Sequence, residues 1–478
     1  MTERRKLLGN SFSLLVNRLT QSITTFVLVA SIARMLGSYD LGQYMLASSY
    51  YFVFMTLVSQ GFKTLFTREL AKKPEETPIY LVNGTLLQLI FSILGYWILF
   101  GVVFALPYSE ETSKVCYILG LAIIPFSLSN ITEAIFQAQE KMHLITASAV
   151  PVYILRLLVM IWVMSLKYDV SVVSTVFVVS EIVVLIIQWC LITRIIKCKW
   201  LIDWDFLWRT TKASKTFLFI EGISVFNSRM QVLILSLLGG EVVVGLYSAI
   251  TQLSQPFEIL SNSLVLAFFP KMSKAIALGK EKQRYLAENL IEILLIVAFP
   301  FMIGIKFIGA NLLVLVYKES NFAQAAIALN IIAIGLVATA FIRPLSYILV
   351  ANGFERINLF DVFISTIIGG VLSTFLVSKY QLNGAAYAVS ISQFISLTVY
   401  IVGVYSRLFY LNLWNVIRRP LLVSILMLVT FFVLQQYSPN VVVTMLVATL
   451  VYALIVSILG IYALGGFGVV SAKLLTKK

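Results

Sequence analysis

Residues 79–104 read IYLVNGTLLQLIFSILGYWILFGVVF, a stretch of 26 positions that holds no charged side chain. About twenty consecutive apolar residues in a helix span the hydrocarbon core of a bilayer. Strands of a membrane barrel instead alternate apolar and polar residues over about ten positions. This continuous run therefore predicts a transmembrane helix, and runs of the same kind recur along the chain.

The composition of the whole chain agrees with this segment. Of 478 residues, 60% are hydrophobic and 12% are charged, whereas a soluble domain is about half apolar and about a quarter charged. We therefore predict an all-α integral membrane protein of about fourteen transmembrane helices. The predicted spans are 11–35, 40–61, 79–104, 115–138, 144–166, 171–194, 215–237, 242–268, 286–308, 324–351, 357–378, 383–405, 414–435 and 441–464.

Lysine and arginine residues concentrate on one side of the predicted membrane. The predicted inner segments hold 26 of them, whereas the outer segments hold four, namely Lys114, Lys167, Lys318 and Lys379. Since short cytoplasmic loops are enriched in Lys and Arg, both termini are predicted to be cytoplasmic. The net charge of +14 thus indicates topology rather than nucleic-acid binding. Arg18 interrupts the first apolar segment and no small-residue cleavage site follows it, so we expect that helix to be retained.

Two halves of the chain resemble each other at an offset of a little over two hundred residues. Leu36–Tyr44 and Leu238–Tyr247 share a Leu-Gly-x-x-x-x-Gly-x-Tyr pattern with one inserted residue, and Lys167-Tyr168 matches Lys379-Tyr380. Parallel repeats of six helices are a transporter architecture with the substrate path between the halves. We predict an N-lobe of helices 1–6 at 1–197, a C-lobe of helices 7–12 at 198–406, and two C-terminal helices at 407–478.

These patterns resemble a known family. The repeated outer turn, Arg68-Glu69-Leu70-Ala71 after the second span, Phe269-Pro270-Lys271 and Ala351-Asn352-Gly353 are similar to Wzx-type polysaccharide-unit flippases of the multidrug/oligosaccharidyl-lipid/polysaccharide (MOP) transporter superfamily. The resemblance implies two six-helix bundles around a central cavity, as in MATE transporters. It also implies movement of undecaprenyl-pyrophosphate-linked oligosaccharide, such as O-antigen units, from the inner to the outer leaflet of the bacterial inner membrane.

Three arginines lie within predicted spans, namely Arg18, Arg229 and Arg343. A charge at bilayer depth costs about 2.5–3.5 kcal/mol on insertion scales, so it usually faces a cavity or a partner. Guanidinium groups bind phosphate bidentately, and these three are candidate pyrophosphate ligands. The alternative is that each pairs with a membrane carboxylate. For Arg156 and Glu181, at similar depth in consecutive helices, an ion pair inside one bundle is the favoured interpretation.

Carboxylates within spans are candidates for a cation-coupling site. Glu221 begins a polar stripe with Ser224, Ser228 and Gln231, Glu258 lies on a polar face of the eighth span, and Asp361 lies near Asn358 and Ser365. No Walker-type phosphate loop occurs, so an ion gradient or the membrane potential would supply the energy. We expect no cofactor, no metal site and no catalytic residues, with H⁺ or Na⁺ as the possible coupling ion.

Two other functions remain open at this point. A drug or cation antiporter of the same fold would have an acidic, aromatic cavity, whereas a flippase for lipid pyrophosphate would have a cationic one. A membrane glycosyltransferase or polymerase would usually carry a large outer loop, but the longest outer segment here is about fifteen residues. The predicted partners are a lipid-linked oligosaccharide, membrane lipids, and polymerase and glycosyltransferases of the same pathway, with no nucleic acid.

Overall fold

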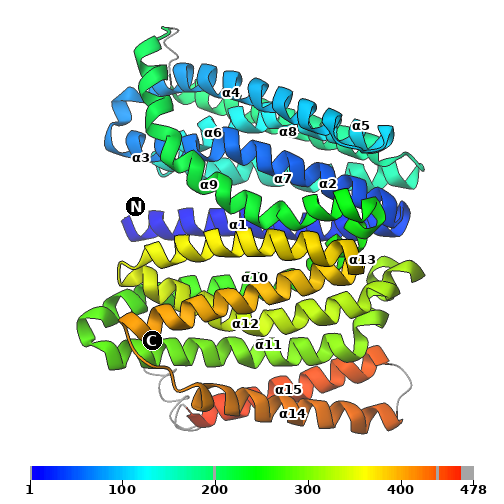
Figure 1. Ribbon diagram of the computed structural model, residues 1–478. Helices are drawn as coiled ribbons and strands as arrows, with labels where there is room; N and C mark the ends of the chain where they lie inside the picture. The colour runs from blue at the N-terminus through cyan, green and yellow to red at the C-terminus, as the bar shows by residue number, and fades with distance from the viewer. Residues whose placement is uncertain (1–2, 197–200, 438–440, 464–478) are drawn as a thin grey trace. The chain divides into compact units, whose positions relative to one another are not determined.

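The computed structural model describes residues 3–196, 201–437 and 441–463, and the regular elements of these residues are all helices (Figure 1). Their bounds are α1 Glu3–Met35, α2 Ser38–Met55, η1 Thr56–Gln60, α3 Gly61–Lys72, η2 Pro74–Glu76, α4 Thr77–Ala105, α5 Glu110–Gly120, α6 Ile123–Ala138, α7 Met142–Ser165, α8 Val170–Ile195, α9 Trp204–Leu238, α10 Gly240–Ala275, η3 Ile276–Leu278, α11 Lys280–Tyr317, η4 Ser320–Ala325, α12 Ala326–Ala351, α13 Glu355–Arg407, α14 Leu413–Tyr437 and α15 Val441–Ala463.

Every predicted span overlaps one of these helices, which confirms the all-helical membrane architecture. Ten helices of the described residues are long and apolar enough to cross a membrane. One of the ten, α13, contains two predicted spans, because Gln381 has φ 49° and ψ −122° and breaks the helix between them. The total of fourteen spans stays a prediction.

The described chain forms two compact units. Unit 1 holds the described residues of Met1–Gln252 with two short segments, Val316–Glu319 and Val377–Leu382, and unit 2 holds the others. Helix α9 therefore belongs to unit 1, and α10 begins in unit 1 and continues into unit 2. The predicted lobe boundary at residue 197 describes the sequence repeat, and it stays a prediction.

Each unit has its own apolar core. In unit 1, a cluster that includes Phe62, Phe66, Phe136 and Phe206 joins α3, α6 and α9. In unit 2, α10, α11, α12 and α13 bury a second cluster, and the C-terminal helices α14 and α15 pack against α11. There Phe307 of α11 lies 5.0 Å from Phe431 of α14 between ring centroids. Lipid tails are as apolar as these side chains, so close packing rather than exclusion of water holds the helices together.

The second span changes helix type at its inner end. It starts as α2, passes through the π-helix η1 at Thr56–Gln60 and continues as α3. A π-helix shifts the backbone hydrogen bonds by one residue. The buried Gln88 of α4 donates through Nε2 to the Val58 carbonyl at 3.2 Å, so a side chain from another helix satisfies a backbone acceptor within the π-helix.

The two copies of the repeated glycine motif meet in unit 1. A Cβ atom on Gly42 would lie 1.8 Å from the Glu241 carbonyl oxygen, and one on Gly245 would lie 2.0 Å from the Ser38 carbonyl oxygen. Each copy therefore supplies the glycine that allows the other copy's backbone to approach. This close approach explains why the second glycine of the motif occurs in both halves.

Hydrogen bonds surround this crossing of α2 and α10. Thr112 of α5 accepts from Gln43 Nε2 at 3.0 Å and donates to Glu241 Oε1 at 2.7 Å. In the loop before α5, the Tyr108 hydroxyl lies 2.9 Å from that of Tyr50 and 2.8 Å from Ser236 Oγ. Burial raises the pKa of Tyr108 above its usual value, so this hydroxyl keeps its proton and can donate.

Candidate functional site

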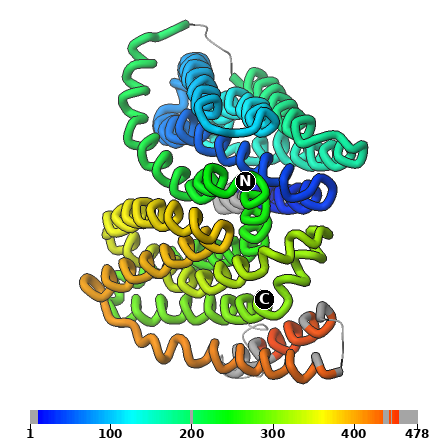
Figure 2. Tube along the Cα trace, turned by 45° about the vertical axis from the view of Figure 1, so that its right-hand side comes forward, coloured from blue at the N-terminus to red at the C-terminus, as the bar shows by residue number. Residues whose placement is uncertain are grey.

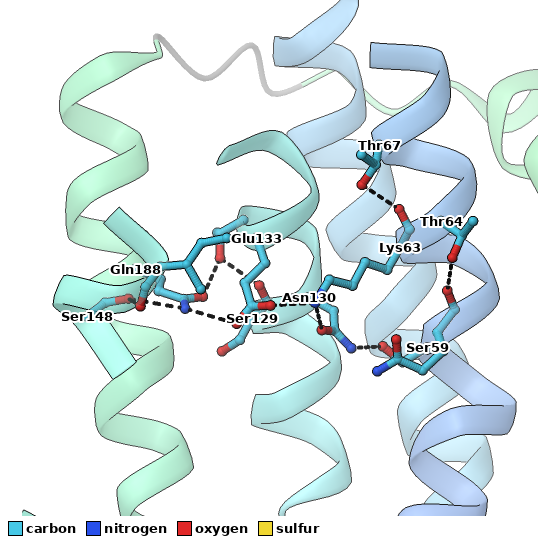
Figure 3. A network of polar contacts seen from close by, with 12 residues as sticks. Ser59, Lys63, Thr64, Thr67, Ser129, Asn130, Glu133, Ser148 and Gln188 are labelled. Carbon is cyan, nitrogen blue, oxygen red and sulfur yellow. Dashed lines mark hydrogen bonds and ion pairs between the residues drawn. The ribbon is translucent and has the colours of Figure 1, made fainter. Parts of the chain in front are cut away.

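A polar network connects four helices of unit 1 near the end of the second span (Figure 3). The Lys63 ammonium of α3 pairs with the Glu133 carboxylate of α6 and donates to Asn130 Oδ1 at 3.2 Å. Asn130 in turn donates to Ser59 of the π-helix. Gln188 of α8 donates to Glu133 at 3.4 Å and to Ser148 of α7 at 3.3 Å. The ion pair and these hydrogen bonds thus connect the polar side chains of α3, α6, α7 and α8 to one another.

Sequence reasoning did not predict this network. Lys63 lies just after the predicted span 40–61 and Glu133 lies within the predicted span 115–138, and no pattern in the sequence linked them. Their similar predicted depth in the membrane could have suggested the pair, because both residues lie close to the cytoplasmic ends of their predicted spans. Since both charges are compensated within one unit, we regard the network as a structural connection rather than as a ligand site.

The second buried charge pair in unit 1 was predicted correctly. Arg156 Nη1 of α7 lies 2.8 Å from Glu181 Oε1 of α8, and the two side chains are 9% and 4% exposed. The guanidinium also lies over the rings of Tyr153 and Phe177, at 4.8 and 4.6 Å from their centroids. This arrangement confirms an ion pair inside one bundle, so the Arg156 charge is already compensated.

Arg229 of α9 has a different environment. Its guanidinium lies over the Phe52 ring of α2 at 4.6 Å from the centroid, and its buried Nε has no hydrogen-bond partner in the described structure. The ion pairs of the described residues do not include it. A neutral aromatic ring attracts a cation through its quadrupole but carries no opposite charge that would neutralise it.

The remaining predicted residues of unit 1 lie on α1 and α9. Arg18 is exposed on α1, and its backbone carbonyl accepts from Ser22 Oγ at 2.9 Å. Glu221 is half-buried on α9, two turns before Arg229, and Ser224 and Ser228 of the same predicted stripe are exposed. Helix α9 therefore carries a carboxylate and a guanidinium, with hydroxyls between them.

In unit 2, the structure brings together two residues that the sequence analysis assigned to different roles. Arg343 Nη2 of α12 lies 3.5 Å from Glu258 Oε2 of α10, with side chains 37% and 47% exposed. This separation is longer than the distance of about 2.7–2.9 Å that is usual for a charge-assisted hydrogen bond, so the contact is loose. The two groups can therefore separate at little cost if a stronger ligand arrives.

Asp361 is buried on α13, and Ser396 and Tyr400 from the second half of that helix lie close to its side chain. Nearby, Asn358 donates to Ser346 Oγ of α12 at 2.8 Å. The Asp361 Oδ1 atom is buried without a hydrogen-bond partner in the described structure. A buried carboxylate oxygen with a free acceptor position could bind a proton or a small cation.

Comparisons with known proteins give matches at the level of sequence and of fold. The family described as polysaccharide biosynthesis protein matches residues 7–276. The capsular polysaccharide biosynthesis protein CapF of Staphylococcus aureus is 26% identical over 186 residues, which are 38% of this chain and 46% of CapF. The chain therefore matches a little under half the length of this relative.

Solved transporter structures share the fold over most of the chain. An inward closed conformation of the lipid II flippase MurJ matches 96% of this chain and 99% of its own, with a TM-score of 0.76 and 18% identity. An inward-facing multidrug resistance MATE family transporter of the MOP superfamily matches 80% of this chain and 94% of its own, with a TM-score of 0.61 and 14% identity. At these identities the likeness concerns the fold, and the predicted MOP-type fold is confirmed.

Proposed function

The chain belongs to the polysaccharide biosynthesis protein family and has the fold of the MOP superfamily, and from this premise we propose that it is a flippase for lipid-linked oligosaccharides. The proposed substrate is an oligosaccharide unit on undecaprenyl pyrophosphate, and the proposed direction is from the inner to the outer leaflet of the bacterial inner membrane. Alternating access would expose the binding site first to one side and then to the other.

The observation that carries this proposal is the uncompensated charge of Arg229. The buried Arg156 has Glu181 as its partner, whereas Arg229 contacts the ring of Phe52. An intramembrane cation without a carboxylate partner is expensive unless it serves a ligand. Pyrophosphate offers several anionic oxygens in the geometry that a guanidinium binds through two parallel hydrogen bonds.

Arg18 and Arg343 are the proposed secondary ligands. Arg18 is exposed on α1, so a substrate can reach it without displacing another group. Arg343 would first have to leave Glu258, and the weakness of an exposed pair at 3.5 Å makes this exchange feasible. Release of Glu258 on substrate binding would also free a carboxylate for a coupling cation.

The proposed energy source is a gradient of H⁺ or Na⁺. A cation shifts a conformational equilibrium only if it binds the two states with different affinity. Glu221, Glu258 and Asp361 are the candidate sites, and Asp361 has a buried oxygen without a hydrogen-bond partner. Protonation or Na⁺ binding at such a carboxylate in one state would favour that state.

The test is transport of a fluorescent undecaprenyl-pyrophosphate oligosaccharide in proteoliposomes that contain the purified protein. We expect Arg229→Ala to lower the initial rate at least tenfold, because a lost charge-assisted hydrogen bond is worth ~1.5–3 kcal/mol. Arg229→Lys should recover part of the rate, since it keeps the charge but not the planar pair of donors.

The matched control is Arg209→Ala, which removes an exposed guanidinium from the same helix. It should transport at the wild-type rate. Normal transport by the Arg229→Ala variant would refute the proposal that Arg229 binds the pyrophosphate. Uptake of a cationic dye by the wild-type protein, with no movement of the lipid, would instead identify a drug antiporter.

A further inference from the structure

The first turns of α9 form a surface helix on unit 1. In Figures 1 and 2, this part of α9 runs across the ends of the unit 1 helices, and α9 then turns to run alongside them. Its inward side chains Phe206, Leu207, Thr210 and Ser214 are buried. The Phe206 ring meets Tyr80 of α4 edge-on, with 4.7 Å between centroids. The segment is therefore a fixed part of unit 1.

The opposite face of the same turns combines tryptophan and lysine. Trp204, Trp208, Lys212 and Lys215 recur every three to four residues, so they form one stripe along the helix. The two indoles are 73% and 64% exposed, and both lysines are exposed. Lys212 Nζ lies over the Trp208 ring at 5.2 Å from its centroid.

The lysine charges of this stripe are not compensated by acidic neighbours on the helix. Asp203 caps the helix by accepting from the Phe206 amide at 2.9 Å. Asp205 lies two turns before Lys212 on the same side of the helix, and Arg209 Nε, one turn after Asp205, donates to the Asp205 carbonyl at 3.3 Å. The ion pairs of the described residues include neither Lys212 nor Lys215.

We propose that this Trp–Lys stripe binds the phosphodiester headgroups of anionic phospholipids in the cytoplasmic leaflet. Tryptophan prefers the depth of the headgroups, and lysine close to an anionic leaflet adds attraction that falls off within a Debye length. The start of α9 packs one face against unit 1 and runs across the ends of its helices. Its other face therefore lies at the depth of the lipid headgroups. Leu201 and Ile202, which precede it, are also exposed, and this apolar surface suits lipid better than an acidic soluble protein.

The site would act on the helix that carries Arg229. Helix α9 is continuous from Trp204 to Leu238, so a lipid bound at its start would hold the beginning of this helix at the depth of the headgroups. The proposal does not depend on the transported substrate, because it concerns only the surface of the surrounding membrane.

The experiment is retention of phosphatidylglycerol by the full-length detergent-solubilised protein, measured by native mass spectrometry against phosphatidylcholine. Wild type should retain phosphatidylglycerol in preference to phosphatidylcholine. Lys212→Gln/Lys215→Gln should weaken phosphatidylglycerol binding by about fivefold per lysine, or ~25-fold together. Added salt should reduce the wild-type preference, since screening weakens exposed charges.

The matched control is Lys271→Gln/Lys274→Gln at the end of α10. These lysines are also exposed and three residues apart, and Lys271 lies over Phe268 at 5.4 Å. The control should keep at least half of the wild-type affinity. Equal losses in the two double variants would indicate a general electrostatic attraction by exposed lysines and would overturn the proposed lipid site on α9. Unchanged retention in Lys212→Gln/Lys215→Gln, or binding of polyglutamate but not of phosphatidylglycerol, would also overturn it.

Discussion

Gly42 and Gly245 are single residues on which the contact between α2 and α10 depends. A methyl group at either position would overlap a backbone carbonyl, Glu241 in one case and Ser38 in the other. Backbone cannot rotate away as a flexible side chain can, so the helices would have to separate. Overpacking of this kind costs typically ~1–3 kcal/mol and occasionally more.

We therefore expect Gly42→Ala and Gly245→Ala each to lower the apparent melting temperature of the purified protein by several degrees. The measurement is the fraction that stays monodisperse in size-exclusion chromatography after heating. Gly101→Ala is the matched control, because a Cβ there would meet open space and alanine is the better helix former. A melting temperature that is unchanged in all three variants would mean that the two motifs do not touch.

Single residues also show how far sequence reasoning reaches at the candidate site. Arg156 and Glu181 could be paired because consecutive antiparallel helices place residues of similar depth side by side. Arg343 and Glu258 could not, because α10 and α12 are not consecutive and only the tertiary fold makes them neighbours. Arg229 has no carboxylate partner in the described structure, and this too depends on how the helices pack. From the sequence, a carboxylate partner and a pyrophosphate ligand were both open.

At the scale of elements, helix ends with a strong local signal were predicted closely. The predicted spans 79–104 and 171–194 correspond to α4 at Thr77–Ala105 and α8 at Val170–Ile195. Asp169 marks the start of α8, since its side chain accepts from the Val172 amide at 3.3 Å, as an N-cap residue does. Helix α9 begins eleven residues before the predicted span 215–237, because its first turns are amphipathic and contain no continuous apolar run.

The π-helix η1 also gave no signal in the sequence, and its stability depends on another helix. Gln88→Leu removes the donor to the Val58 carbonyl, and the loss of one such hydrogen bond costs about 0.5–1.5 kcal/mol. We expect faster amide hydrogen exchange across Thr56–Gln60, measured by mass spectrometry, with little change in unit 2. The exposed Gln21→Leu on α1 should leave the exchange unaltered. A uniform increase over the whole protein would contradict this local role.

At the scale of the whole molecule, the chain crosses between the two units near the end of α11, within α13 and, at the first crossing, within α10. The unit boundary falls between Gln252 and Leu253, inside that helix, and Pro256 follows within one turn. Proline lacks the amide proton for a helical hydrogen bond and weakens the helix at that point. The same helix begins at the glycine crossing with α2. A helix that is held at one end and weakened near the boundary suits a transporter whose parts must change orientation.

The charge distribution predicts how the whole chain is arranged in the membrane, and this prediction can be tested by labelling. In a variant without the native Cys116, Cys190 and Cys198, an impermeant maleimide should label Lys114→Cys in intact cells. It should label Lys274→Cys and Lys473→Cys only after the cells are permeabilised. The reason is that six predicted spans separate residue 274 from residue 473, and an even number returns the chain to the cytoplasmic side, where Lys and Arg accumulate. If Lys473→Cys reacts in intact cells while Lys274→Cys does not, the number of spans between them is odd and the total of fourteen is wrong.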